Sequence, residues 1–274
     1  MDVEQQKKAT TQVFETVADG YDHPSLRFFP FCADFLLQHL KPHSHSKILD
    51  VATGTGMFAT AAAVSIAPTG RVTGIDLSEA MLAQLHHKAS RMRLQNIDTH
   101  VMDAEQLEFR NDYFDAVVCS YGLFFMPDMD KALKSWLRVT KPGGTVMFTS
   151  FGEDAFQPLM SLFSEQIEKF GVKMAYKPVQ LLHNVDTCRN MLENAGAQNV
   201  DVTTRQFGYH LRSAEDWWDA LWNSGTRGYL DSLSPTDLAA FRRTHLQAVG
   251  ELATDKGIWL DIQTHITRGH KPGS

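Results

Sequence analysis

Strand-like and helix-like segments alternate between residues 47 and 152, and this alternation constrains the fold more than any other feature of the chain. Short apolar runs predict strands at 47–51, 71–76, 97–103, 114–122 and 145–152. Patterns between them predict helices at 56–66, 78–94 and 128–140, the second with Ser78 as its N-cap. Such an alternation is typical of a parallel sheet covered by helices on both faces. The sequence therefore predicts a doubly wound α/β fold.

Helical patterns precede and follow this alternation. Residues 1–46 predict an N-terminal helical cap. Beyond residue 150, helices predicted at 155–174 and 187–197 are followed by two strand-like runs at 199–211 and 257–271. The stretch between the two runs, about residues 212–256, is rich in tryptophan and mostly helical. A connection of this length predicts a lid or an oligomerisation element.

Composition argues against several classes of protein. The formal net charge of -6 argues against a chain that neutralises the phosphates of nucleic acid. Cys32, Cys119 and Cys188 lie far apart, so neither a disulfide framework nor a metal site is predicted. No apolar run reaches the ~18 to 20 residues of a membrane-spanning helix, and the N-terminus lacks the apolar core of a signal peptide. We therefore expect a cytoplasmic protein without stable membrane insertion.

A glycine-rich turn, "DVATGTGMFA", follows the first predicted strand. Gly54, Gly56 and Ala59 match the spacing G-x-G-x-x-G/A of a dinucleotide-binding turn. Such a turn lets the backbone approach a ligand closely and directs the free N–H groups of a helix N-terminus toward it. Asp76 lies 20 residues after Gly56, where an acid can bind ribose hydroxyls. These residues fit NAD, FAD or an amino-acid nucleoside such as S-adenosylmethionine.

Two further acids favour the amino-acid nucleoside. Asp50 immediately precedes the turn, where its charge would repel a pyrophosphate but can support an ammonium group. Asp103 ends the third predicted strand, where its carboxylate can accept a hydrogen bond from the exocyclic amine of adenine. The acids around the turn thus indicate S-adenosylmethionine, and an oxidoreductase that uses NAD or FAD is the remote alternative.

Five motifs in order carry a resemblance to a known family: "ILDVATGTG", "VTGIDLSEAML", "MDAEQLEF", "FDAVVCSYGLFFMPDMDKAL" and "LRVTKPGGTVMF". Together they resemble the class I S-adenosylmethionine-dependent methyltransferases, and most closely the ubiquinone and menaquinone C-methyltransferase branch. The resemblance implies a Rossmann-like, seven-stranded sheet with an antiparallel last strand. It also implies one structural domain, in which residues 1–46 form the cap and residues 47–274 the methyltransferase domain with its lid at about 212–256.

The resemblance also implies roles for individual residues. Asp76 would hold the ribose, Asp103 and Ala104 the edge of adenine, and Tyr21 would close over the cofactor. Ala52 stands where many class I enzymes have a glycine, a departure that the quinone branch commonly tolerates. The complete set of predicted cofactor contacts is Tyr21, Ala52, Thr53, Gly54, Gly56, Asp76, Leu77, Met81, Asp103, Ala104 and Ser120.

Aromatic residues and two histidines are candidates for the methyl-acceptor pocket. Tyr121, Phe124 and Phe125 follow the fourth predicted strand, and Trp218 and Trp222 share one face of a predicted helix, where core packing is the alternative. His23 and His183 fall where this fold opens its acceptor pocket, and each is a candidate general base, with a solvated or capping histidine as the alternative.

The function expected from these features is transfer of a methyl group to an oxygen or carbon of a small apolar or aromatic acceptor, such as a quinone, a phenol or a secondary metabolite. An N-methyltransferase of a small amine and a protein that binds S-adenosylmethionine without transferring methyl remain alternatives. The expected partner is the small-molecule acceptor, with no nucleic acid and with a homodimer left open. The sequence does not name the acceptor.

Overall fold

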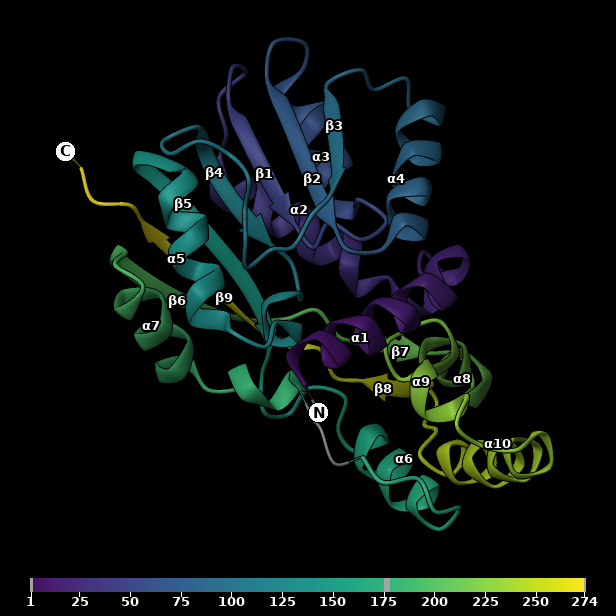
Figure 1. Cartoon of the computed structure of the whole chain (residues 1–274). Helices are drawn as coiled ribbons and strands as arrows, with labels where there is room; N and C mark the ends of the chain where they lie inside the picture. The colour runs from purple at the N-terminus through teal and green to yellow at the C-terminus, as the bar shows by residue number, and fades with distance from the viewer. Residues whose placement is uncertain (1, 175–177, 274) are drawn as a thin grey trace.

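A seven-stranded sheet forms the centre of the computed structural model, which describes residues 2–174 and 178–273 (Figure 1). Its strand order is β3-β2-β1-β4-β5-β9-β6. β9 runs antiparallel to both of its neighbours, β5 and β6, and the other six strands share one direction. The predicted doubly wound, Rossmann-like sheet with an antiparallel last strand is confirmed. The strands are β1 (Lys47–Val51), β2 (Arg71–Asp76), β3 (Ile97–Val101), β4 (Phe114–Cys119), β5 (Thr140–Phe151), β6 (Gln198–Gln206) and β9 (Gln263–His270).

Helices cover both faces of the sheet. In the view of Figure 1, α2 (Phe28–Leu40) and α3 (Met57–Ile66) lie behind it, and α5 (Met129–Val139) and α7 (Val185–Asn194) lie in front. α4 (Glu79–Arg91) packs on β2 and β3 and begins at Ser78, whose side chain accepts a hydrogen bond from the Met81 backbone N–H at 3.1 Å. α2 buries Phe28, Cys32, Ala33 and Leu36, the spacing of one helical face.

The start of β5 differs from the sequence prediction. The segment "KPGG" was expected to be a turn before a strand at 145–152, whereas β5 begins at Thr140. Phe114 of β4 pairs with Thr140, and Ala116, two residues later, pairs with Thr145. The four residues between Thr140 and Thr145 therefore form an irregularity within the strand, and Gly143 allows it with a φ of +76°.

The two C-terminal strand-like runs each divide into two strands. The run 199–211 forms β6 and the short β7 (Tyr209–Leu211), and the run 257–271 forms β8 (Ile258–Leu260) and β9. β7 and β8 pair with each other in a separate two-stranded sheet. This small sheet leads from the central sheet into the tryptophan-rich stretch, an arrangement that the sequence analysis missed.

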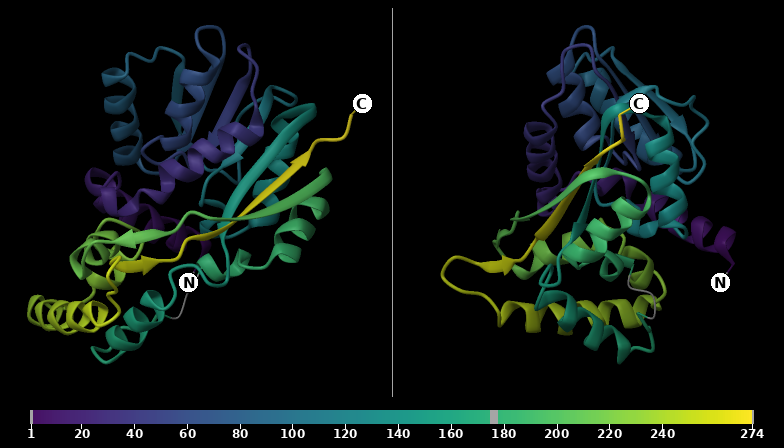
Figure 2. Two further views of the ribbon diagram at one scale, coloured as in Figure 1. Left: turned by 180° about the vertical axis from the view of Figure 1, so that it is seen from behind. Right: turned by 90° about the vertical axis from the view of Figure 1, so that its left-hand side faces the viewer.

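The remaining helices gather beyond the carboxyl ends of the parallel strands (Figures 1 and 2). None of the helices described is both long and apolar enough to cross a bilayer. The tryptophan-rich stretch contains α8 (Ala214–Trp222), α9 (Arg227–Leu230) and α10 (Pro235–Gly250). Beside them lie α1 (Val3–Val17), α6 (Leu159–Glu168) and the short 3₁₀ helices η1 (Ala18–Gly20), η2 (Pro24–Leu26), η3 (Leu123–Phe125) and η4 (Pro178–Leu182).

Candidate active site

The glycine-rich turn after β1 forms one wall of a cavity, which we call the first cavity. Ala52 and Gly54 adopt left-handed φ values of 51° and 53°, which expose the backbone of the turn. The N–H of Gly54 donates to one carboxylate oxygen of Asp76 at 2.9 Å, and the N–H of Ser78 donates to the other at 2.9 Å. A carboxylate offers about four acceptor positions, so Asp76 retains capacity for two ligand hydroxyls.

Asp50 lies under the same turn and is 2% exposed. Burial raises its pKa from 3.8 to about 7, and the hydrogen bond from the Thr53 hydroxyl at 2.6 Å opposes part of this rise. A buried acid with this pKa carries its negative charge most readily when a cation lies nearby. The first cavity therefore has an anionic position ready for an ammonium group.

The opposite end of the first cavity contains a lysine between two acids. Lys7 of α1 lies 2.7 Å from Asp103 and 2.5 Å from Glu105. Leu77 and Met81 supply apolar surface to the same cavity. An apolar surface edged by carboxylate oxygens fits a flat heterocycle with an exocyclic amine. Together with Asp76 and Asp50, these residues fit the adenine, ribose and methionyl parts of S-adenosylmethionine.

Ten of the eleven predicted cofactor residues line the first cavity. The exception is Gly56, which begins α3 with a φ of +80° and lies against Leu85 instead. A Cβ at Gly56 would lie 2.1 Å from Leu85 Cδ1, so the glycine allows close packing of α3 on α4. The sequence analysis missed several lining residues from α1, among them Lys7 and Phe14, because no local motif marks them.

Five aromatic residues form what we call the aromatic wall. Each ring contacts the next one in a row, with centroid separations of 5.2, 6.0, 5.1 and 5.7 Å. All five line the first cavity and also a second one, so the wall is shared by the two cavities. In order of contact the wall consists of Phe125, Phe14, Tyr21, Phe29 and Tyr121.

Two tyrosines of the aromatic wall are uncharged. The Tyr21 ring lies over the turn, since a Cβ at Gly54 would be 3.9 Å from Tyr21 Cε1. Burial raises the pKa of Tyr21 and of Tyr121 above the ordinary tyrosine value. The Tyr121 hydroxyl lies 2.8 Å from the Thr264 hydroxyl, a buried hydrogen bond that fixes the ring. Neither phenol is therefore suited to act as a base at neutral pH.

The second cavity extends beyond the aromatic wall, has a volume of about 590 Å³ and is lined mainly by apolar side chains. Segments distant in sequence form it: the end of β5, α6, η4, and α8 and α9 of the insertion. The predicted pocket residues Tyr121, Phe124 and Phe125 line it. This volume lies within the roughly 300–1,000 Å³ of most pockets for small ligands, so the second cavity accommodates a small apolar molecule.

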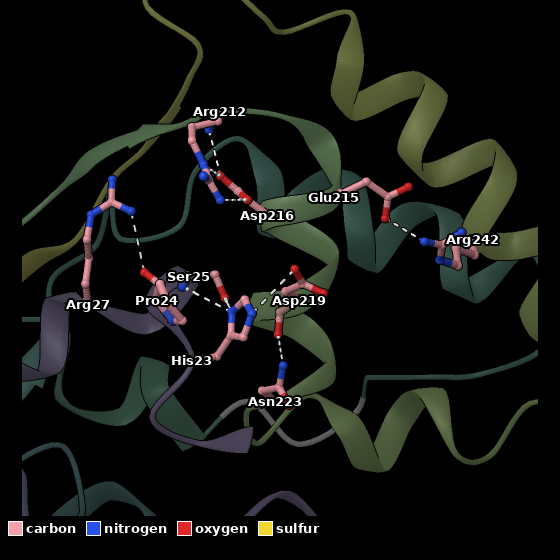
Figure 3. Close-up of polar contacts among 10 residues, drawn as sticks. All are labelled: His23, Pro24, Ser25, Arg27, Arg212, Glu215, Asp216, Asp219, Asn223 and Arg242. Atoms are coloured by element: carbon pink, nitrogen blue, oxygen red, sulfur yellow. Dashed lines mark hydrogen bonds and ion pairs between the residues drawn. The ribbon is translucent and has the colours of Figure 1, made fainter. Parts of the chain in front are cut away.

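The two predicted bases differ in position. His183 lines the second cavity, and its Nδ1 faces the carbonyl oxygen of Gln180. His23 lines neither cavity, which corrects its predicted role. Its Nδ1 accepts a hydrogen bond from the Ser25 N–H at 3.2 Å, and its Nε2 lies 3.8 Å from Asp219 of α8 (Figure 3). His23 is thus the N-cap of η2, the capping alternative.

The predicted tryptophans also need a correction. Trp218 and Trp222 share a helical face, with rings stacked at 6.1 Å, but neither lines the second cavity. Trp218 packs on Phe241 of α10, and Arg227 covers the ring of Trp222. Trp217, which points to another face of α8, lines the cavity instead. Helical periodicity placed Trp218 and Trp222 on one face but could not show which face of the helix points toward the cavity.

Comparison with known proteins agrees with this geometry. The model of the ubiE/COQ5 methyltransferase family matches residues 1–212. The ubiquinone/menaquinone biosynthesis C-methyltransferase UbiE of Ralstonia pickettii is 32% identical over 222 residues, which cover 73% of this chain and 89% of that protein. The aklanonic acid methyltransferase DauC of Streptomyces sp. is 33% identical over 144 residues. The match covers 53% of this chain and 66% of that protein, just under two thirds of its length.

A solved structure shares the fold. Phosphoethanolamine N-methyltransferase 2 of Haemonchus contortus, in complex with phosphomonomethylethanolamine and S-adenosylhomocysteine, superposes with a TM-score of 0.58. The two sequences are 18% identical, and the match covers 94% of this chain and 60% of that chain. At this identity the likeness concerns the fold alone.

Proposed function

The chain belongs to the ubiE/COQ5 methyltransferase family, and from this membership we propose that it methylates an oxygen or carbon of a small apolar or aromatic molecule held in the second cavity. The chain is an S-adenosylmethionine-dependent methyltransferase. The names of its relatives, a quinone C-methyltransferase and an aklanonic acid methyltransferase, support a quinone, a phenol or an aromatic secondary metabolite as acceptor.

The aromatic wall shared by the two cavities carries the proposal. Methyl transfer requires donor and acceptor to meet at ~3 to 3.5 Å, so the two binding sites must adjoin. Here the apolar second cavity adjoins the first at five aromatic rings. Aromatic faces attract cations and exclude water, and both properties suit a wall beside a sulfonium.

S-Adenosylmethionine supplies a methyl group attached to a positively charged sulfur. The first cavity would hold it through Asp76 at the ribose, Asp103 at the adenine and Asp50 near the ammonium. As the new bond from the acceptor oxygen or carbon to the methyl forms, the bond from methyl to sulfur breaks and the sulfur becomes neutral. The proton released by a phenol or carbon acid then needs a base on the acceptor side.

We propose that His183 is the base that accepts this proton. Its Nδ1 faces a backbone carbonyl, which accepts hydrogen bonds only, so in the neutral ring Nδ1 carries the proton. The lone pair is then on Nε2, and the residue lines the second cavity. Its backbone is held by His265, whose Nε2 lies 2.8 Å from the His183 carbonyl oxygen.

Incorporation of labelled methyl tests the proposal. The protein is incubated with S-adenosylmethionine labelled in the methyl group and, separately, with 1,4-dihydroxynaphthalene, 2-hydroxyanthraquinone and an aromatic amine such as 2-naphthylamine. We expect label in the hydroxylated aromatics, on oxygen or carbon. Label in the amine alone would replace the proposal with N-methylation. Binding of S-adenosylhomocysteine without transfer to any member of a wider acceptor panel would favour the non-methylating alternative.

Three predictions from the sequence are carried forward here as proposals. The division into an N-terminal cap (1–46) and a lid (about 212–256) is tested by limited proteolysis with and without S-adenosylhomocysteine, which should protect the cap. A homodimer is tested by light scattering coupled to size-exclusion chromatography. Cytoplasmic location is tested by cell fractionation.

A further inference from the structure

A chain of hydrogen bonds, buried at Trp217 and His245 and partly buried at Gln166, connects three helices beside the second cavity. The indole N–H of Trp217 in α8 donates to Nε2 of His245 in α10 at 2.9 Å. Nδ1 of His245 lies 2.6 Å from Oε1 of Gln166 in α6. Because Nε2 accepts, the single proton of the neutral ring is on Nδ1 and is donated to Gln166. Each of the two hydrogen bonds therefore pairs one donor with one acceptor.

The environment of His245 keeps the ring neutral and immobile. The residue is fully buried, and burial lowers its pKa to about 4. Phe241, one turn earlier on α10, stacks on the imidazole at a centroid distance of 5.1 Å, and the ring of Phe163 of α6 makes a T-shaped contact at a centroid distance of 5.7 Å. A neutral imidazole with both nitrogens bonded is a rigid spacer between two helices.

The two helices that this spacer joins form walls of the second cavity. Trp217 lines the cavity from α8, and Met160, Ser161, Ser164 and Glu165 line it from α6. His245 itself is outside the lining, behind both walls. α6 and α8 come from distant parts of the chain, so no covalent connection fixes their spacing. α10 packs against both helices, and His245 is a buried residue of α10 that forms a hydrogen bond with each of them.

We propose that His245 is a positioning residue that sets the width of the second cavity by fixing Trp217 of α8 relative to α6, and so determines which acceptors fit. The proposal deepens the proposed function and rests on it for the identity of the occupant. It assigns acceptor selection to a residue that touches neither acceptor nor cofactor. The family model matches residues 1–212, so His245 lies outside the matched part of the chain.

Three variants separate positioning from general stability. His245→Leu removes both hydrogen bonds while keeping an apolar side chain. His245→Gln keeps an acceptor and a donor on one amide. Arg242→Gln is the matched control, because Arg242 lies one turn away on α10 and forms an exposed ion pair with Glu215 of α8 at 2.5 Å (Figure 3). It therefore joins α10 to α8 at the surface and takes no part in the hydrogen bonds of His245.

Three quantities are measured for each variant with 2-hydroxyanthraquinone as the probe. The KM of the probe and the kcat are measured at saturating S-adenosylmethionine, and the equilibrium Kd of the probe is measured from quenching of tryptophan fluorescence. The Kd for S-adenosylhomocysteine is measured by calorimetry. For His245→Leu we expect KM and Kd of the probe to rise about tenfold, the scale of a lost buried hydrogen bond. The cofactor Kd should stay within about twofold, and His245→Gln should recover most of the loss. Arg242→Gln should change each quantity less than about twofold.

A probe Kd that changes less than twofold in His245→Leu would overturn the proposal, as would a parallel rise in the cofactor Kd. Should His245→Leu fail to fold, Trp217→Phe provides the test, because it removes the indole N–H that donates to His245 and keeps a smaller aromatic ring in the cavity lining. The same weakening of probe binding with unchanged cofactor Kd is expected, and an unchanged probe Kd would again contradict the proposal. If the wild type binds the probe without methylating it or the other acceptors, the proposed function fails while the binding comparison still decides the role of His245.

Discussion

Asp50 gives the most quantitative prediction, because its buried carboxyl couples cofactor binding to pH. In the ligand-free chain, burial raises the pKa of Asp50 from 3.8 to about 7. Each pKa unit corresponds to about 1.36 kcal/mol, so burial costs the ionised form roughly 4 kcal/mol. The methionyl ammonium, placed near Asp50, would favour that ionised form. Binding should therefore draw a proton off Asp50 and lower its pKa.

The size of the effect follows from the ionised fraction. With a pKa of about 7, roughly one tenth of Asp50 is ionised at pH 6 and nearly all of it above pH 8. The affinity for S-adenosylhomocysteine should thus rise about tenfold from pH 6 to pH 8, and binding at pH 6 should release nearly one proton. Thr53→Val removes the hydroxyl that donates to Asp50 at 2.6 Å, so the midpoint of the pH curve should move to higher pH.

Calorimetric titrations between pH 5.5 and 8.5, in pairs of buffers with different ionisation enthalpies, measure both the affinity and the protons released. Asp50→Asn is the control, because its amide has a similar shape and does not titrate; its affinity should not vary with pH in this range. An affinity in the wild type that stays constant between pH 6 and 8 would refute the reasoning. The same slope in Asp50→Asn would show that another group is responsible.

The same pKa has a consequence for folding. An acid whose pKa is raised on folding holds its proton more tightly in the folded chain. Its contribution to the free energy of unfolding is therefore most favourable below pH 3.8 and decreases as pH rises to about 7. The difference in stability between Asp50→Asn and the wild type, measured by urea unfolding without ligand, should accordingly grow from pH 4 to pH 7 in favour of the variant.

Three other variants test separate parts of the site. Asp76→Ala should weaken binding of S-adenosylhomocysteine by about 1 to 3 kcal/mol in calorimetry, because ribose hydroxyls lose a buried acceptor; an unchanged Kd would remove the ribose assignment. Gly56→Ala should lower the melting temperature, since its φ is +80° and its Cβ would meet Leu85 at 2.1 Å, whereas Gly250→Ala, with open space around it, should leave it nearly unchanged. His183→Ala should lower kcat about 10²- to 10⁴-fold for a phenol while the cofactor Kd stays constant; a kcat within a few-fold of the wild type would exclude the base role.

Much of the central sheet could be predicted because its signals are local. The strand 71–76 was predicted within its observed bounds, since an apolar run and its flanking turn residues are close in sequence. Most predicted cofactor residues lie at strand ends, and parallel strands bring their carboxyl ends to one edge of the sheet. The extension of β5 back to Thr140 was not predictable, because it depends on pairing with β4, more than 20 residues earlier.

The sequence by itself determined the alternation of strands and helices, the glycine-rich turn at Gly54 and the acids around it, because periodicity, backbone freedom and charge belong to each short segment. Only the tertiary structure decided which side chains meet. It brought Phe14 of α1 to the aromatic wall, turned Trp217 rather than Trp218 toward the second cavity, and connected α6 to α8 through His245. A helical pattern defines the angles between side chains on one helix, whereas the packing of distant segments defines the direction that each face takes.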